Sequence, residues 1–212
     1  MSKRKRSTCV ATTASQQQQQ VVTSYGVLLY RKVTCSHGQN GADDKNRNND
    51  NNKDKTKKKI QFLLGMIPQR NWWTVFKGLP DNKEESPYET ALREFEEETG
   101  IPKGLIPKIE PEHVLTGKVN KHKKLEIYLQ NGSNFDESKF DLNKVVKIDS
   151  GYMKGQPEIV KIRWLTFEEA LITGIDGAKI YKSQQHILKQ AHEFLVLQQQ
   201  QQQQRQKTHD EE

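Results

Sequence analysis

Short runs of apolar, β-branched and aromatic residues recur along the chain, and at residues 159–165 apolar residues alternate with basic ones; both patterns are typical of β-strands. They predict strands at residues 21–31, 60–66, 72–76, 113–119, 125–130 and 159–165. Apolar residues spaced for an amphipathic helix predict helices at residues 87–99 and 183–197, and a short helix after Thr166. Because strands and helices do not alternate regularly, the sequence favours an α+β fold built on a mixed sheet.

The helix at residues 87–99 has the most clearly marked ends in the sequence. Ser86 and Glu89 have the spacing of a capping box, and Pro87 stands at the first helical position. Gly100 and Pro102 follow the last helical residue and predict that the helix stops there.

Three segments are rich in a few polar residue types. Residues 1–20 end in a glutamine run, residues 33–59 are rich in Asn, Asp and Lys, and residues 198–212 begin with another glutamine run. Such segments bury too little apolar surface to offset the entropy lost on ordering. With 33% hydrophobic residues overall, the sequence predicts one folded domain at residues 21–197, interrupted by a disordered insertion and flanked by disordered tails.

The formal net charge of +7 comes mainly from two of these segments. Residues 1–20 carry four basic side chains and no acidic one, and residues 33–59 carry seven basic and four acidic ones. The predicted core is therefore nearly neutral and gives no indication of an RNA partner. The basic tail leaves RNA binding and a nuclear signal open as alternatives to a solvated segment.

Cysteine content and hydropathy favour an intracellular protein. The two cysteines, Cys9 and Cys35, both lie in the polar segments, where a disulfide framework is not expected. The sequence has no apolar run of about 18 residues and no apolar stretch after its basic start. We therefore expect no membrane association and a cytoplasmic location, with a nuclear one as the alternative.

Three glutamates of the predicted helix lie on one face. Glu94, Glu97 and Glu98 are spaced i, i+3 and i+4, so their carboxylates stand about one turn apart. Like charges at this spacing repel one another unless cations compensate them. Hard divalent cations prefer oxygen ligands, so the pattern indicates a Mg²⁺ or Mn²⁺ site, with an ordinary solvated acidic face as the alternative.

The surrounding segment, WTVFKGLPDNKEESPYETALREFEEETGI at residues 73–101, resembles the box that defines the Nudix hydrolase family. The family pattern is G-x5-E-x7-R-E-U-x-E-E-x-G-U, where U is apolar. Its second half matches at every defined position: Arg93, Glu94, Phe95, Glu97, Glu98, Gly100 and Ile101. The resemblance implies a Nudix-like α/β/α sandwich with a central mixed sheet, and a metal-dependent phosphoanhydride hydrolase.

The first half of the box is one residue longer than the family pattern. Counting back from Arg93 places the early glutamate at Glu85, but the glycine position then falls on Leu79 rather than on Gly78. The loop is therefore expected to contain one inserted residue, which leaves open whether Glu84 or Glu85 takes the glutamate's place.

Carried over position by position, the resemblance implies the following roles. Glu94, Glu97, Glu98 and the Gly78 carbonyl bind Mg²⁺ or Mn²⁺, and Arg93 orients a glutamate. Glu158, in a P-E strand entry that resembles the family's, is an additional candidate carboxylate, and either Glu97 or Glu158 is the general base.

The substrate is less well defined by the sequence. Lys77 stands in a K-G entry that resembles that of family members acting on dinucleoside polyphosphates or diphosphoinositol polyphosphates, which implies a substrate contact. Trp72 and Trp73 point to opposite faces of a strand, and Trp73 is a candidate for stacking on a base, with packing in the core as the alternative. The preferred substrate is a dinucleoside polyphosphate, with diphosphoinositol polyphosphates and the RNA cap as alternatives. A further alternative is a Nudix-fold binding module whose altered loop has reduced its activity, with RNA or protein as partner.

Overall fold

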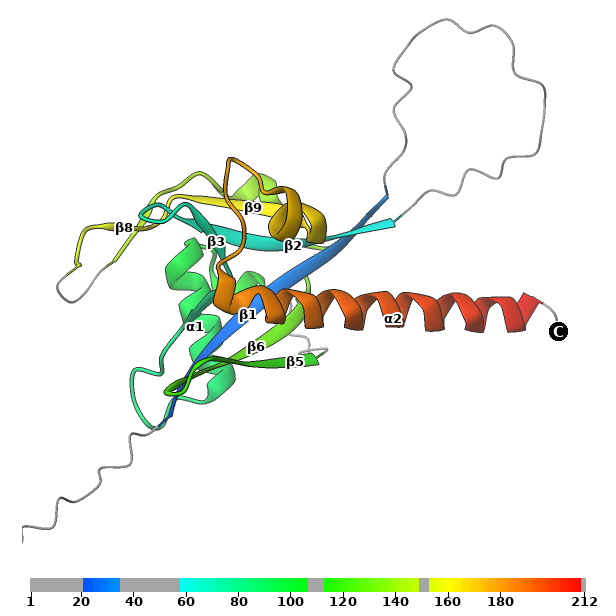
Figure 1. Ribbon diagram of the computed structural model, residues 1–212, viewed down its shortest axis with the longest axis horizontal. Coiled ribbons are helices and arrows are strands. Elements are labelled where there is room, and N and C mark those ends of the chain that lie inside the picture. Colours follow the sequence, from blue (N-terminus) through cyan, green and yellow to red (C-terminus); the bar gives the residue numbers. More distant parts are fainter. Residues whose placement is uncertain (1–20, 35–57, 107–112, 149–152, 211–212) are drawn as a thin grey trace, which may run out of the picture.

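The computed structural model describes residues 21–34, 58–106, 113–148 and 153–210 of the chain (Figure 1). The predicted N-terminal tail at residues 1–20, and most of the predicted insertion, lie outside the described residues. The strands are β1 (Val22–Thr34), β2 (Lys58–Ile67), β3 (Trp72–Thr74), β4 (Phe76–Gly78), β5 (His113–Asn120), β6 (Lys123–Asn131), β7 (Val146–Lys147), β8 (Pro157–Ile159) and β9 (Lys161–Thr166). The helices are α1 (Pro87–Thr99), α2 (Gln185–Asp210) and the short turns η1 (Lys103–Leu105), η2 (Glu137–Lys139), η3 (Glu169–Thr173) and η4 (Lys182–Gln184).

A mixed, seven-stranded sheet forms the centre of the molecule. Its main path is β3-β2-β1-β6-β5, with β4 paired to β1 and β9 paired to β2. β1 runs parallel to β6 and antiparallel to both β2 and β4. The long β1 reaches β4 with its first half and β2 with its second half, and so connects the strand that enters the predicted site to the rest of the sheet.

Each face of this sheet carries its own hydrophobic core. On one side, Phe76 and Val27 pack against Ala91 and Phe95 of α1. On the other side, sheet residues such as Leu125 and Ile127 pack against α2, including Leu188. The alternation of side chains along a strand makes this arrangement possible, since successive residues point to opposite faces. The predicted α/β/α sandwich with a mixed central sheet is confirmed.

The predicted ends of α1 are confirmed residue by residue. The Ser86 hydroxyl accepts a hydrogen bond from the Glu89 backbone N–H, and the Glu89 carboxylate accepts one from the Ser86 N–H. Gly100 closes the helix in the left-handed conformation at φ 70°, which glycine adopts without steric cost. These local signals fix where the acidic face begins and ends.

The sequence prediction for the last helix is wrong at its C-terminal end. Residues 183–197 were expected to be helical and residues after 197 to be disordered, but α2 continues to Asp210. Glutamine has a good intrinsic helix propensity, and no Gly or Pro interrupts the run. Figure 1 shows this polar extension projecting beyond the sheet. Among the described residues, no helix combines the length and apolar character needed to cross a membrane.

Two strand boundaries also differ from the predictions. β1 and β2 continue as paired strands through Val33 and Lys59, so these residues belong to the sheet and not to the insertion. The predicted strand 72–76 is divided at Val75, where the buried Gln184 side chain accepts the backbone N–H at 2.9 Å. A side chain distant in sequence takes the place of a strand neighbour there, which periodicity alone does not reveal.

Candidate metal and active site

Glu98 is the most deeply buried carboxylate of α1. It is only 5% exposed, and its Oε2 accepts a hydrogen bond of 2.7 Å from the Lys77 backbone N–H on β4. Burial raises the pKa of Glu98 to about 8, although the nearby Lys77 charge opposes the shift. A carboxylate held in this way is unfavourable when charged unless a cation approaches it.

Glu94 of α1 lies directly against Gly78, which belongs to β4 like Lys77. A Cβ added at Gly78 would overlap the Glu94 carboxyl group, so any side chain at this position would displace that carboxylate. Burial raises the pKa of Glu94, and the Arg93 charge opposes this shift. β4 therefore holds both Glu94 and Glu98, one against a glycine and the other through a backbone N–H.

Arg93 ties the helix to the loop that precedes it. Its Nε donates to Glu85 at 2.8 Å, and one Nη donates to Glu94 at 3.0 Å and to Glu97 at 2.9 Å. The other Nη donates to the Leu79 carbonyl at 2.8 Å. The planar fork of an arginine can serve several acceptors at once, so Arg93 fixes both the loop and the two carboxylates. The orienting role predicted for Arg93 remains a proposal that this geometry supports.

The structure distinguishes the two candidates for the early glutamate of the loop. Glu85 receives two hydrogen bonds from Arg93, at 2.8 and 3.2 Å, and also accepts the Asp81 backbone N–H. Glu84 is exposed, and only its backbone N–H is bonded, to Asn82. Because the Arg93 guanidinium holds Glu85, the pKa of Glu85 falls to about 2. The additional residue is thus accommodated within the loop, before Glu85.

We expect Glu85→Gln to destabilise the protein by about 1 kcal/mol at neutral pH, because charge-assisted hydrogen bonds to Arg93 become neutral ones. The folded-state pKa of about 2 lies below the ordinary value of 4.5. The Glu85 contribution is therefore complete above pH 4.5 and is lost as the pH falls toward 2. Urea unfolding from pH 7 to pH 3 should show the two proteins converging at low pH.

Glu84→Gln is the matched control for this experiment, because it removes the same charge one residue earlier. It should leave the free energy of unfolding within about 0.5 kcal/mol of the native value at each pH. A larger loss for Glu84→Gln than for Glu85→Gln would contradict the assignment of the loop register.

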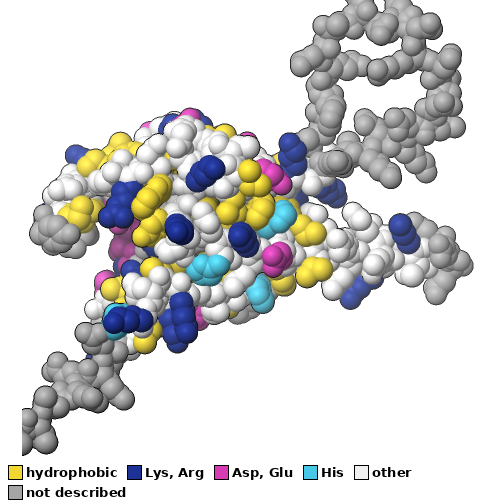
Figure 2. Space-filling model, in the orientation of Figure 1, with side chains coloured by type: hydrophobic (Ala, Val, Ile, Leu, Met, Phe, Trp, Pro, Cys, Tyr) yellow, Lys and Arg dark blue, Asp and Glu magenta, His cyan; other side chains and the backbone are white. Residues whose placement is uncertain are grey.

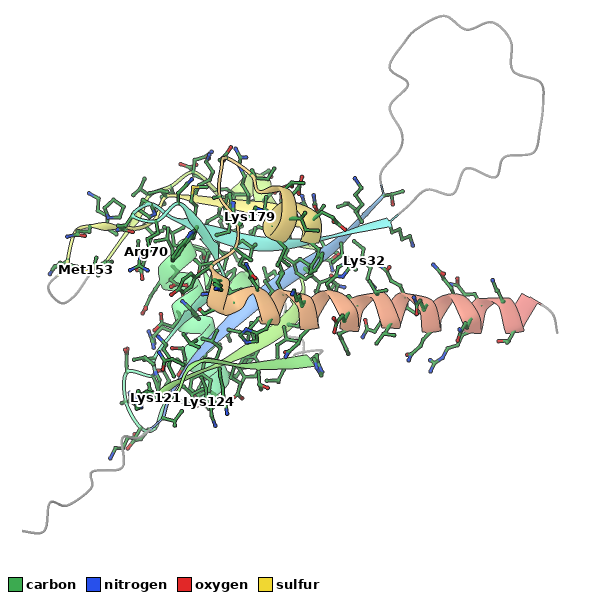
Figure 3. The ribbon with its side chains drawn as sticks, in the orientation of Figure 1. Lys32, Arg70, Lys121, Lys124, Met153 and Lys179 are labelled. Carbon is green, nitrogen blue, oxygen red and sulfur yellow. The ribbon has the colours of Figure 1, made fainter. Side chains whose placement is uncertain are left out.

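Glu158 is a third carboxylate near Glu94 and Glu98, but it does not belong to α1. It lies on β8, and its charge raises the pKa of both Glu94 and Glu98. Together with Glu98 and Lys77 it lines a cavity of about 210 Å³, whose walls also include Thr74 and Met153. Figure 3 shows Met153 at the edge of the molecule. Neither Glu94 nor Glu97 is among the lining residues; Arg93 pairs with both, and the Glu97 side chain is half-exposed.

A family model for the NUDIX domain matches residues 54–190, well over half of the chain. The chain belongs to the Nudix family. It is a Nudix-type phosphoanhydride hydrolase, as the motif implied.

Solved structures of Nudix proteins resemble the chain at low sequence identity. A C. elegans Ap4A hydrolase in a binary complex is 22% identical, covering 83% of this chain and 98% of that one, with a TM-score of 0.47. The NUDIX domain of Shewanella oneidensis NrtR, complexed with ADP ribose, is 16% identical over 82% and 88%, with a TM-score of 0.46. The M. smegmatis Nudix hydrolase RenU is 10% identical over 83% and 87%, with a TM-score of 0.48. A comparison with curated proteins gives no match.

The acidic cluster fits the divalent metal that Nudix hydrolases generally use. The Glu158 charge raises the pKa of both Glu94 and Glu98, and the Glu94 charge also raises that of Glu98; a divalent cation would favour the charged forms. Gly78 leaves no side chain between its backbone and the Glu94 carboxylate. Within the described residues, however, no three acidic, histidine or cysteine side chains are already arranged as a coordination site.

The two predicted substrate contacts lie in different surroundings. Lys77 lines the cavity with Glu98. Trp73 is completely buried, and its indole N–H is directed to the Ile175 carbonyl, so its ring cannot stack on a base. Its neighbour Trp72 is the one that points outward, because adjacent strand residues face opposite sides.

A second lysine approaches the site in addition to Lys77. Lys123 opens β6 and lies near enough to Lys77 and Glu94 for their charges to influence its pKa, which burial lowers. The sequence places it in a basic turn and gives no sign that it differs from the solvated lysines beside it. The parallel pairing of Lys123 with Val22 of β1 brings it toward the site.

Proposed function

We propose that the protein hydrolyses a phosphoanhydride of a dinucleoside polyphosphate with Mg²⁺ or Mn²⁺. The observation that carries this proposal is that Glu98 and Glu158 line a cavity with Lys77, and that Glu94 is near enough for its charge to raise the pKa of Glu98. An acidic group that holds a divalent cation, flanked by lysines, suits a substrate with several adjacent phosphates.

The positions of the side chains support the proposed roles. Glu94, Glu97, Glu98 and the Gly78 carbonyl would hold the cation, which, when bound, lowers the pKa of water and neutralises charge on the leaving phosphate. Arg93 positions Glu94 and Glu97 through the hydrogen bonds described above.

We propose that Glu158 is the general base that takes the proton from the attacking water. Glu158 lines the cavity beside Glu98, whereas Glu97 accepts a hydrogen bond from Arg93 and lies outside the lining residues. A base must reach the proton that it abstracts, and this favours the residue inside the cavity. Lys77 and Lys123 would neutralise the phosphates that do not react.

The substrate is tested with a panel of diadenosine polyphosphates, a diphosphoinositol polyphosphate and capped RNA. Product release is measured with Mg²⁺, with Mn²⁺ and with EDTA. We expect metal-dependent cleavage with the highest kcat/KM on a dinucleoside polyphosphate. A tenfold preference for either other substrate would replace the proposed one. Silence on the whole panel, with salt-sensitive retention of RNA, would indicate a binding module instead.

Gly78→Ala should lower metal-dependent turnover, because the added methyl group displaces the Glu94 carboxylate. We expect kcat/KM to fall by about 10²-fold, a cost of about 2.7 kcal/mol in transition-state stabilisation. Gly104→Ala is the control, since a Cβ there meets no atom within 4 Å. Equal activity of both variants would remove Gly78 from the site.

Residues after Leu197 are expected to be dispensable for hydrolysis, although α2 continues beyond them. The last fully buried side chain of α2 is Leu195, and the residues that the structure describes from 201 to 208 are exposed. A chain that ends at Leu197 should retain kcat/KM within about twofold and lose little stability, as expected for exposed positions. Loss of activity on truncation would show that the glutamine-rich helix contributes to the site.

A further inference from the structure

A second, larger cavity lies beside the turn between β2 and β3. Its volume is about 440 Å³, within the usual range for small-molecule sites. It is formed by that turn and the segment that leads into α2, and its lining includes Arg70, Asn71, Trp72, Lys179, Lys182 and Gln185. It shares no lining residue with the cavity of Glu98 and Glu158.

The cavity is strongly basic. Arg70, Lys179 and Lys182 are exposed, and in the described part of the chain none of the three forms an ion pair with a carboxylate. Asp176, which is close in sequence, is already bound by Lys161 at 2.9 Å and by Arg163 at 3.3 Å. Figure 3 labels Arg70 and Lys179 on the same side of the molecule, and Figure 2 shows Lys and Arg side chains around apolar ones on this face.

The geometry of the cavity is fixed by aromatic and backbone contacts. Trp72 stacks on Tyr181 with ring centroids 4.5 Å apart, and the Arg70 guanidinium lies 5.2 Å from the Trp72 centroid. The Trp73 backbone N–H donates to the Lys179 carbonyl at 3.0 Å, and the Tyr181 backbone N–H donates to the Trp73 carbonyl at 2.8 Å. The backbone that carries Lys179 is therefore held in register with β3, so ligand binding requires little ordering of the chain.

We propose that this cavity is a second binding site that accepts a phosphate-bearing anion. A guanidinium and two ammonium groups supply charge-assisted hydrogen bonds to phosphate oxygens, and the arginine fork matches them in a bidentate manner. The lining residues include no acid that would attract a cation instead. The site goes beyond the proposed hydrolysis, since its residues are separate from those of the acidic cluster.

Two classes of ligand could supply the phosphate groups that this cavity would bind: an inorganic polyphosphate or a nucleotide. Both would use Arg70, Lys179 and Lys182. Only a nucleotide would also gain from the aromatic wall at Trp72 and Tyr181, because a base can stack on such rings or on the guanidinium plane. Trp72 also provides a signal at the cavity that does not depend on enzyme activity.

The test uses the full chain in EDTA, where metal-dependent binding at the acidic cluster is suppressed. Pyrophosphate, ADP and adenosine are titrated while the Trp72 indole N–H signal is followed by NMR, assigned with Trp72→Phe, and affinities are measured by calorimetry. We expect saturable shifts with pyrophosphate and ADP, none with adenosine, and weaker binding at high salt.

The decisive variant replaces Arg70, Lys179 and Lys182 by Gln. It should weaken pyrophosphate and ADP binding at least about tenfold. The matched control replaces the exposed Lys103, Lys139 and Lys189 by Gln, which changes the net charge equally, and should bind within about twofold of the native chain. Equal weakening of both variants, native binding by the first, or no response of the Trp72 signal would overturn the proposal.

Trp72→Leu distinguishes the two sources. If it weakens ADP binding several-fold but leaves pyrophosphate unchanged, the cavity is a nucleotide site. If both ligands bind as they do to the native chain, the site recognises the phosphates alone. Both results support an anion site, because the charge variants decide that question independently.

Discussion

We expect Glu98→Gln to reduce kcat/KM by roughly 10²- to 10³-fold while the folded protein stays at least as stable as the native chain without metal. The amide oxygen can still accept the Lys77 N–H, so the link between α1 and β4 is kept. The charge that a divalent cation needs is lost. The substitution also removes the free-energy cost of ionising the buried Glu98 carboxyl group, whose pKa is about 8, and this offsets any loss of stability.

The stability of this variant also has a defined pH dependence. The folded-state pKa of Glu98 is raised to about 8 from an ordinary value of 4.5. Between these values the unfolded chain releases the proton first, so the native metal-free protein loses stability as the pH rises from about 4.5 to about 8. Glu98→Gln should lack this loss. Thermal unfolding of both proteins at pH 5 and pH 8 in EDTA measures it.

Glu97→Gln should also lose most turnover, since Glu97 is assigned to the cation together with Glu94 and Glu98. Glu96→Gln is the control on the same helix, because Glu96 lies between these residues in sequence and points away from their common face. It should keep kcat/KM within about twofold. If Glu97→Gln and Glu98→Gln both hydrolyse the substrate at near-native rates with metal, the assignment of the site to α1 is wrong.

Local signals account for the part of this site that the sequence predicts correctly. The capping box at Ser86 and Glu89 and the stop at Gly100 depend only on neighbouring residues, and they place the helix at its observed bounds. Helical spacing then brings Glu94 and Glu98 to one face. The fold class follows from the same periodic patterns, because each strand and helix must bury its apolar side.

Long-range contacts account for what the sequence does not reveal. Nothing near Val75 indicates that Gln184 interrupts the strand, or that Trp73 rather than Trp72 faces the core. Counting residues could not decide between Glu84 and Glu85, because the choice depends on how the loop folds back onto Arg93. The continuation of α2 has a different, local cause: a low-complexity run is typical of disordered segments, yet glutamine favours a helix.

Arg93→Gln should have the largest effect on stability, a loss of about 3 to 5 kcal/mol, because it leaves several acidic groups without their common partner. Arg93 is 19% exposed and bonds Glu85, Glu94 and Glu97, and it also holds the Leu79 carbonyl. Urea unfolding at pH 7.5 measures the loss. The surface residue Arg163, which pairs with Asp176 at 43% side-chain exposure, provides the control as Arg163→Gln, with an expected loss below about 1 kcal/mol.

Arg93→Lys separates charge from geometry at the same position. A lysine keeps the positive charge, but its single ammonium group cannot reach the Leu79 carbonyl, Glu85 and Glu97 at the same time. We expect about half the destabilisation of Arg93→Gln, and a fall in kcat of about tenfold or more even where the protein is fully folded, because Glu94 and Glu97 lose their orientation. Native stability and native kcat in Arg93→Lys would show that charge alone suffices, and that the fork joining the elongated loop to α1 has no positioning role.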